Sequence, residues 1–161
     1  MRKVVEWAGL TGEERVLDLF CGSGNLTLPL AQRARQIWGI DQDRQAIDHA
    51  VENARKNHLN NCRFIAASAE EGIRLALQEA KGVEVVVLDP PRSGARAILD
   101  RLAASWPSKI LYVSCEPPTL VRDLNRLAEL GYKVERIQPL DMFPQTYHVE
   151  VIAECKRQNM G

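Results

Sequence analysis

The stretch "YVSCEPPTLVRDL", residues 112–124, places a thiol between an apolar run and a helical pattern. The residues before Cys115 are typical of a strand, and the spacing from Thr119 onward is typical of a helix. Pro117 and Pro118 fix two φ angles close behind the thiol, which predicts a stiff loop. A helix start stabilises a thiolate, and a stiff loop reduces the entropy lost in presenting it. We therefore predict that Cys115 is a nucleophile.

The other three cysteines, Cys21, Cys62 and Cys155, are predicted to be small buried side chains. All four cysteines are far apart in the sequence, and no C-x-x-C pair is present. This spacing predicts neither a metal site nor a disulfide framework, and it is typical of a reducing, cytoplasmic setting.

A carboxylate stands near the C-terminal end of the chain in "DMFPQTYHVE". His148 and Glu150 are two residues apart at the start of a predicted strand, so they share one face of it. Glu150 is either a solvated edge residue or a positioned base. The local sequence alone favours the solvated residue, because a carboxylate is rarely buried without a partner.

Two glycines, Gly22 and Gly24, follow the first apolar run in "VLDLFCGSGNLTLPLA". Glycines at a strand-to-helix turn permit a tight bend and the close approach of a ligand. The helix start predicted behind them favours an anion. Thr27 stands where the dinucleotide fingerprint has its third glycine, which disfavours NAD and FAD.

An acidic residue, Asp41, ends the second apolar run, in "IWGID". An acid at that place accepts hydrogen bonds from ribose hydroxyls. A glycine turn and this acid, without a pyrophosphate fingerprint, fit a nucleoside ligand such as S-adenosylmethionine (SAM). The carboxyl ends of parallel strands share one edge of a sheet, so the two features together predict a SAM site. Its methionine carboxylate would lie near the helix start.

A third acid, Asp89, ends the apolar run of "VEVVVLDPP" and begins "LDPPRSG". Its strand is predicted to be central and buried on both faces, so Asp89 should open on the same crevice. The element resembles the D-P-P-aromatic motif of amino-group methyltransferases, except that Arg92 takes the aromatic position.

Short apolar runs alternate with helical patterns along the chain, which predicts a parallel sheet with helices on both faces. The last two strands are joined by a loop alone, so we expect them to be antiparallel. The predicted fold is a doubly wound, Rossmann-like α/β methyltransferase fold with a seven-stranded, mainly parallel sheet and a reversed last strand. Strands are expected at 15–19, 36–40, 63–66, 83–88, 109–113, 132–138 and 148–154. Helices are expected at 2–8, 25–33, 44–57, 69–79, 95–104 and 119–130.

The composition is that of an ordinary globular chain of 161 residues, which predicts one domain over residues 1–161. No apolar run is long enough to span a membrane. Lys plus Arg number 21 and so do Asp plus Glu. A chain without net positive charge has little electrostatic attraction for nucleic acid, so we expect it to bind RNA weakly by itself.

Four motifs, "LDLFCGSGNLTLPLA", "DPPRSG", "YVSCEPPTLVRDL" and "DMFPQTYHVE", occur in this order. Together they resemble the catalytic domain of the RNA uracil-C5 methyltransferases, over nearly the whole chain. The resemblance implies SAM-dependent formation of 5-methyluridine in tRNA or 23S-type ribosomal RNA, with RNA as the partner. It also implies a nucleophile at Cys115, a general base at Glu150, cofactor contacts at Phe20, Asn25, Asp41 and Asp89, and a further cofactor contact at Ser68.

The chemistry of such a reaction explains these residue types. C5 of uracil is a poor nucleophile until a thiolate adds to C6. After methylation C5 still carries a proton, which a carboxylate must remove before the cysteine leaves. One thiol, one base and one methyl donor are required.

The chain departs from the family in two ways. Glu116 replaces the Asn of the usual S-C-N-P motif, and a carboxylate pointing inward would disfavour a thiolate. Family members usually carry an N-terminal RNA-binding domain, which residues 1–161 lack, so we expect an excised catalytic domain.

Three alternatives stay open. RNA cytosine-C5 methyltransferases typically have a Pro-Cys dipeptide, whereas Pro91 follows Pro90 here. An amino-group methyltransferase needs no cysteine and favours an aromatic residue at the position of Arg92. A non-catalytic SAM- or RNA-binding module needs neither Cys115 nor Glu150.

Overall fold

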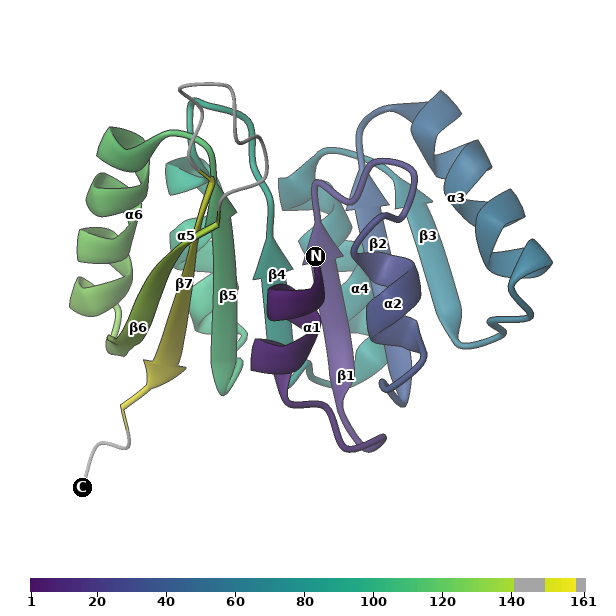
Figure 1. Cartoon of the computed structure of the whole chain (residues 1–161), viewed down its shortest axis with the longest axis horizontal. Coiled ribbons are helices and arrows are strands. Elements are labelled where there is room, and N and C mark those ends of the chain that lie inside the picture. Colours follow the sequence, from purple (N-terminus) through teal and green to yellow (C-terminus); the bar gives the residue numbers. More distant parts are fainter. Residues whose placement is uncertain (141–149, 159–161) are drawn as a thin grey trace.

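A seven-stranded sheet lies at the centre of the computed structural model, which describes residues 1–140 and 150–158 (Figure 1). The strand order is β3-β2-β1-β4-β5-β7-β6. Strands β1 to β5 pair in parallel, and β7 runs antiparallel between β5 and β6. The strands are β1 Arg15–Leu19, β2 Gln36–Asp41, β3 Cys62–Ala66, β4 Val85–Leu88, β5 Lys109–Ser114, β6 Tyr132–Leu140 and β7 Glu150–Arg157. The predicted fold class and the reversed last strand are confirmed.

Helices cover both faces of the sheet (Figure 1). Buried residues of α4, α5 and α6 form one core layer, and those of α1 and α2 form the other. Helix α3 packs against β2 and β3. The helices are α1 Arg2–Ala8, α2 Thr27–Ala31, α3 Arg44–Lys56, α4 Ala69–Ala80, α5 Arg96–Ala104 and α6 Pro117–Glu129. No helix within residues 1–140 and 150–158 has the length and apolar character needed to cross a membrane.

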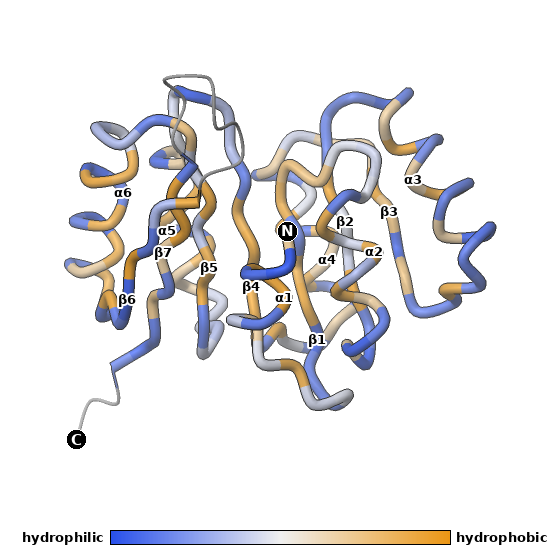
Figure 2. The backbone as a smooth tube through the Cα atoms, in the orientation of Figure 1, coloured by the Kyte–Doolittle hydropathy of each residue, from blue (hydrophilic) through white to orange (hydrophobic). Residues whose placement is uncertain are grey.

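The central strands are apolar on both sides, which explains the two layers. In β4, Val86 and Leu88 face the core of α4, α5 and α6, whereas Val85 and Val87 face that of α1 and α2. All four are buried. Figure 2 shows the same pattern, with apolar colour along the central strands and polar colour on the outer helix α3.

Two helices, α2 at both ends and α6 at its start, differ from the prediction by two residues, whereas the other helix ends agree to within one residue. Helix α2 is only five residues long, because the amide of Asn61 donates to the carbonyl oxygens of Ala31 and Ala34 at 2.7 and 2.9 Å and ends the helix there. Helix α6 begins at Pro117, two residues earlier than expected. The two prolines therefore form the first turn of the helix, where an N–H has no partner to lose. The predicted start of the last strand, residues 148–149, lies outside the described residues.

A buried carboxylate joins α6 to the loop that follows β4. Asp123 on α6 is fully buried. Its Oδ2 accepts hydrogen bonds from the hydroxyl of Tyr112 and from the backbone N–H of Ala95, both at 2.7 Å. Burial and the bond to Asp123 raise the pKa of Tyr112, so the hydroxyl keeps its proton. The helix behind Cys115 and the loop that begins at Asp89 are thereby held together.

We predict that Asp123→Ala lowers the free energy of unfolding by roughly 2–5 kcal/mol, because a buried N–H and a buried hydroxyl lose their acceptor. The exposed Asp48→Ala is the control and should cost less than about 0.5 kcal/mol. Urea unfolding followed by circular dichroism measures both. Equal losses in the two variants would show that the buried network does not stabilise the fold.

Candidate active site

The predicted site residues gather at one edge of the sheet, where parallel strands end (Figure 1). The glycine turn follows β1, Asp41 ends β2, Asp89 follows β4 and Cys115 follows β5. Strand β7 is antiparallel to β5, so its first residue, Glu150, lies at this edge as well. Topology alone therefore brings these side chains to one side of the molecule.

The turn after β1 has an unusual backbone. Phe20 has φ 64°, a left-handed value that is rare for a bulky residue, and such strain is concentrated at ligand sites. Gly22 and Gly24 also have positive φ, at 52° and 89°. A Cβ on Gly22 would meet no atom within 4 Å, so open space adjoins the backbone there. The close approach of a cofactor that the sequence predicts needs such space.

Asp41 holds this turn in place. Its Oδ2 accepts the backbone N–H of Gly22, and its Oδ1 accepts that of Asp43, both at 2.9 Å. Each carboxylate oxygen has a second lone-pair direction, so Asp41 can still accept a ribose hydroxyl. It has a structural role in the turn that the sequence did not reveal.

A functional candidate missed in the sequence is Asp18, one residue before the end of β1. It is fully buried; Thr27 donates to its Oδ2 at 2.5 Å, and its Oδ1 has no hydrogen-bond partner among the described residues. Burial raises its pKa from 3.8 to about 7; the bond from Thr27 opposes the shift, and the charges of Asp89 and Asp41 add to it. The sequence did contain a signal for this residue, because an acid inside the apolar run "VLDLF" indicates a buried carboxyl group. An unpartnered buried acceptor below the glycine turn fits a cationic or hydroxyl-bearing ligand.

A cavity of about 200 Å³ opens at the same edge. Asn25 from the glycine turn, Asp89 and Glu150 line it, together with apolar residues that include Val113 and Leu140. Asp89 is accessible at the cavity, but protein surrounds much of its carboxyl group. This desolvation, and secondly the negative charge of Glu150, raises its pKa to about 6. Three polar side chains from three distant segments thus line one cavity.

Cys115 and Glu150 both lie just beyond the last residue pair of β5 and β7. Ser114, the last residue of β5, pairs with Val151. Cys115 follows Ser114 and Glu150 precedes Val151, so the two side chains occupy the next position beyond that pair. Cys115 is half-buried. Glu116 occupies the N-cap of α6, but its side chain makes no capping hydrogen bond.

The remaining cysteines differ from Cys115. Cys21 and Cys155 are buried, as predicted, whereas Cys62 is only partly buried. Burial raises the pKa of Cys21, that of Cys155 to about 12 and that of Cys62 to about 11. All three therefore remain neutral thiols.

Of the predicted cofactor contacts, Asn25 and Asp89 line this cavity, whereas Phe20, Gly22, Gly24, Asp41 and Ser68 do not. Ser68 is exposed, and its hydroxyl oxygen accepts the N–H of Glu71 at 3.3 Å as the N-cap of α4. Its O–H remains able to donate to a ligand. Phe20 is half-buried against the core layer of α4, α5 and α6. The helix α2, expected to receive the methionine carboxylate at its start, is too short to supply a strong dipole.

Comparison with known families decides the assignment. A family model described as tRNA (uracil-5-)-methyltransferase matches residues 1–157. The chain belongs to this family. The predicted resemblance is thereby confirmed, and so is membership among RNA uracil-C5 methyltransferases.

Relatives of this uracil-C5 methyltransferase domain include proteins from bacteria and an archaeon. It is 50% identical over 151 residues to an uncharacterized RNA methyltransferase of Geobacter sulfurreducens, covering 93% of this chain and 30% of that protein. It is 44% identical to the 23S rRNA (uracil(1939)-C(5))-methyltransferase of Pseudomonas fluorescens, covering 94% and 33%. The chain therefore spans about a third of the length of the curated relatives it matches.

A solved relative of the domain supports the cofactor. The crystal structure of the Pyrococcus abyssi tRNA (uracil-54, C5)-methyltransferase contains S-adenosyl-L-homocysteine. It is 37% identical, with a TM-score of 0.79, and the match covers 96% of this chain and 36% of that one. The predicted cofactor, SAM, is confirmed for the family. The open space at Gly22, the spare lone pairs of Asp41 and the unpartnered Oδ1 of Asp18 fit such a group.

The buried Asp18 predicts a dependence of stability on pH. Its pKa is higher in the folded chain, about 7, than in the unfolded chain, near 3.8. The contribution of Asp18 to the free energy of unfolding is therefore fully present below pH 4 and is lost as pH rises to 7. The loss is on the order of 4 kcal/mol. Asn resembles the protonated acid, so Asp18→Asn should match the wild type near pH 4 and be more stable near pH 7.5. Urea unfolding at several pH values tests this, and parallel curves for the two proteins would contradict it.

Proposed function

We propose that this domain transfers a methyl group from SAM to C5 of a uridine in RNA, through a covalent adduct between Cys115 and C6. The substrate is a uridine of tRNA or of large-subunit ribosomal RNA. One observation carries the proposal: the pairing of Ser114 with Val151 places Cys115 and Glu150 just beyond the same end of one strand pair, at the edge that also carries the glycine turn and Asp89.

The turn after β1 and the acids beside it would hold the cofactor. Gly22 allows its backbone approach, and Asp41 would accept hydrogen bonds from ribose hydroxyls. Asp89, with a pKa of about 6, is mostly ionised at neutral pH and places negative charge beside a ligand that carries a sulfonium and an ammonium group. When bound, SAM supplies an electrophilic methyl group at this edge.

The chemical roles fall to two side chains. The Sγ of Cys115 adds to C6 of uracil, and electron density moves to C5, which becomes nucleophilic. After C5 has been methylated, Glu150 removes the proton that C5 still carries. The electron pair of that C–H bond forms the C5–C6 double bond, and the thiolate of Cys115 leaves.

The family assignment favours uracil over the cytosine alternative. A thiol and a carboxylate at the same end of one strand pair favour a catalytic domain over a binding module. Because the chain spans a third of its relatives, we further propose that efficient action on RNA depends on a separate RNA-binding domain. The zero net charge supports this division.

The cofactor site is tested by calorimetric titration with S-adenosylhomocysteine. We expect Asp41→Ala to bind it roughly 10- to 100-fold more weakly than the wild type, because the variant loses ribose contacts and the bonds that hold the turn. Asp48→Ala, on the outer helix α3, is the matched control and should bind normally. Equal affinity for Asp41→Ala and the wild type would remove Asp41 from the cofactor site.

The two catalytic roles are tested together by trapping on RNA. Cys115→Ala should neither methylate uridine nor form a covalent complex. Glu150→Gln should transfer the methyl group but release product at least about 100-fold more slowly, since a general base contributes about that much. It should therefore accumulate as a protein–RNA adduct on a denaturing gel.

Controls make this experiment decisive. RNA with 5-fluorouridine should trap the wild type in the same way, because fluorine cannot leave as a proton does. Cys62→Ala, which removes a half-buried thiol distant from this edge, should behave as wild type. Low salt and high protein concentration compensate for weak RNA binding. Methylation by Cys115→Ala under these conditions would show that the nucleophile is assigned wrongly.

A further inference from the structure

A second cavity, of about 710 Å³, lies between α5 and α6, beside the loop that begins at Asp89. Three arginines line it: Arg96 from α5, and Arg122 and Arg126 from α6. Ser93 and Gly94 of the loop and Asp100 complete the main part of its wall. This cavity, the arginine groove, is separate from the cavity that Asp89 and Glu150 line.

Arg122 is held rigidly within the groove. Its Nε donates to Oδ1 of the buried Asp123 at 2.9 Å, and its Nη2 donates to the backbone oxygen of Ser93 at 2.9 Å. Its Nη1 has no hydrogen-bond partner among the described residues. A guanidinium fixed on one side, with a donor left over on the other, is pre-organised for an oxyanion.

Gly94 adapts the loop to this arrangement. Its φ is +81°, and a Cβ there would come within 2.5 Å of Oδ2 of Asp123 and 2.6 Å of Nη2 of Arg122. Any other residue would push the loop away from the anchored guanidinium. The loop therefore closes against Arg122 only because position 94 has no side chain.

The other two arginines, Arg96 and Arg126, can form ion pairs with an added phosphate. Arg96 is exposed and forms no ion pair within residues 1–140 and 150–158. Arg126 pairs with Asp100 and with Glu129. Exposed pairs of this kind contribute little to stability. A phosphate can therefore replace Asp100 as the partner of Arg126 at small cost.

We propose that the arginine groove binds a phosphodiester group of the RNA strand whose uridine reacts at Cys115. This inference rests on the proposed function. Planar guanidinium groups match phosphate oxygens in geometry as well as in charge. Gly94 is five residues after Asp89 in the sequence, so the groove lies at most about 17 Å from Asp89 along the loop. One short RNA segment can span that distance.

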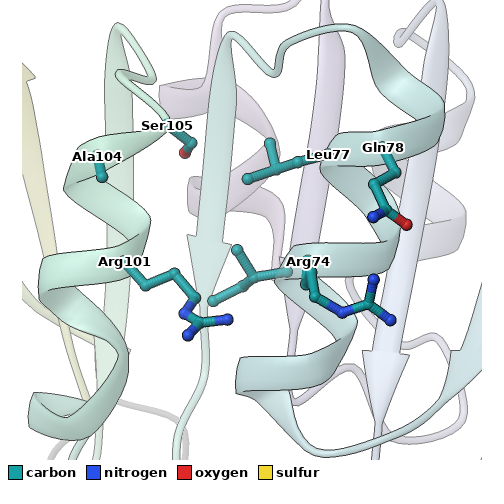
Figure 3. A pocket seen from close by; sticks show the side chains of 7 residues that line it. Arg74, Leu77, Gln78, Arg101, Ala104 and Ser105 are labelled. Carbon is teal, nitrogen blue, oxygen red and sulfur yellow. The ribbon is translucent and has the colours of Figure 1, made fainter.

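A neighbouring groove provides the comparison. It lies between α4 and α5 and is lined by the apolar Ile73 and Leu77, with Arg74 and Arg101 at its rim (Figure 3). Arg101 pairs with Glu70 of α4. Arg101 therefore stands on the same helix as Arg96, is also exposed, and belongs to a different groove. Arg101→Gln is a control of equal charge change.

The test measures the affinity of the whole chain for a short single-stranded RNA containing uridine, without SAM, at several low salt concentrations. Arg96→Gln should lower the affinity about 3- to 10-fold and reduce the slope of log K against log salt by about 0.7, the value for one phosphate contact on a single strand. Arg101→Gln should leave the slope unchanged. Both variants should bind S-adenosylhomocysteine normally, and Arg96→Gln should raise KM for RNA without changing kcat.

The outcomes distinguish a failure of the proposed phosphate site from a failure of the proposed function. The groove is not a phosphate site if the wild type methylates RNA but Arg96→Gln has the salt slope and KM of the wild type. The same conclusion follows if Arg96→Gln loses no more RNA affinity than Arg101→Gln does. If the slope falls in Arg96→Gln alone, while the wild type neither methylates nor is trapped by 5-fluorouridine, the groove is supported and the proposed function fails.

Discussion

The antiparallel register between β5 and β7 determines which side chains meet at the reaction edge. Val151 lies opposite Ser114, and the residues beyond this pair are Glu150 and Cys115. A slip of one residue would turn Glu150 to the other face of the sheet. Burial prevents such a slip, because Ile152 packs in the layer of α1 and α2 whereas Ala153 and Cys155 pack in that of α4, α5 and α6. The apolar core thus fixes the position of a carboxylate at the end of the strand.

The cofactor edge is held in a conformation that is unfavourable for the isolated backbone. Phe20 adopts a left-handed φ, and the fully buried Asp18 has an acceptor without a partner. Both features reduce the stability of the fold without ligand. Asp41 compensates in part, since its carboxylate binds two backbone N–H groups and fixes the turn. A surface prepared in this way loses little entropy when a nucleoside binds.

Local sequence predicted the sheet well and the site in part. The apolar runs around Leu17 and Val86 identify central strands because two faces of burial leave no polar periodicity. The length of α2 could not be predicted, because Asn61, thirty residues beyond its end, terminates it. Asp18 was not predicted as a site residue, because strand propensity does not indicate that its Oδ1 has no hydrogen-bond partner. The approach of Glu150 to Cys115 depends on strand register, so only the family resemblance indicated it.

The net charge is zero, but acidic and basic side chains gather at different places on the surface. Asp18, Asp41, Asp89 and Glu150 make the cofactor edge acidic, which suits a positively charged sulfonium and opposes RNA phosphates. RNA must still reach Cys115 at that edge. Phosphates need a cationic site close to the acids but outside their cavity, and the loop after β4 provides one, with Asp89 at one end and the arginine groove at the other. Asp123 anchors both Arg122 and the N–H of Ala95 at the end of that loop. A single buried carboxylate therefore sets the spacing between the place for a methyl donor and the place for a phosphate.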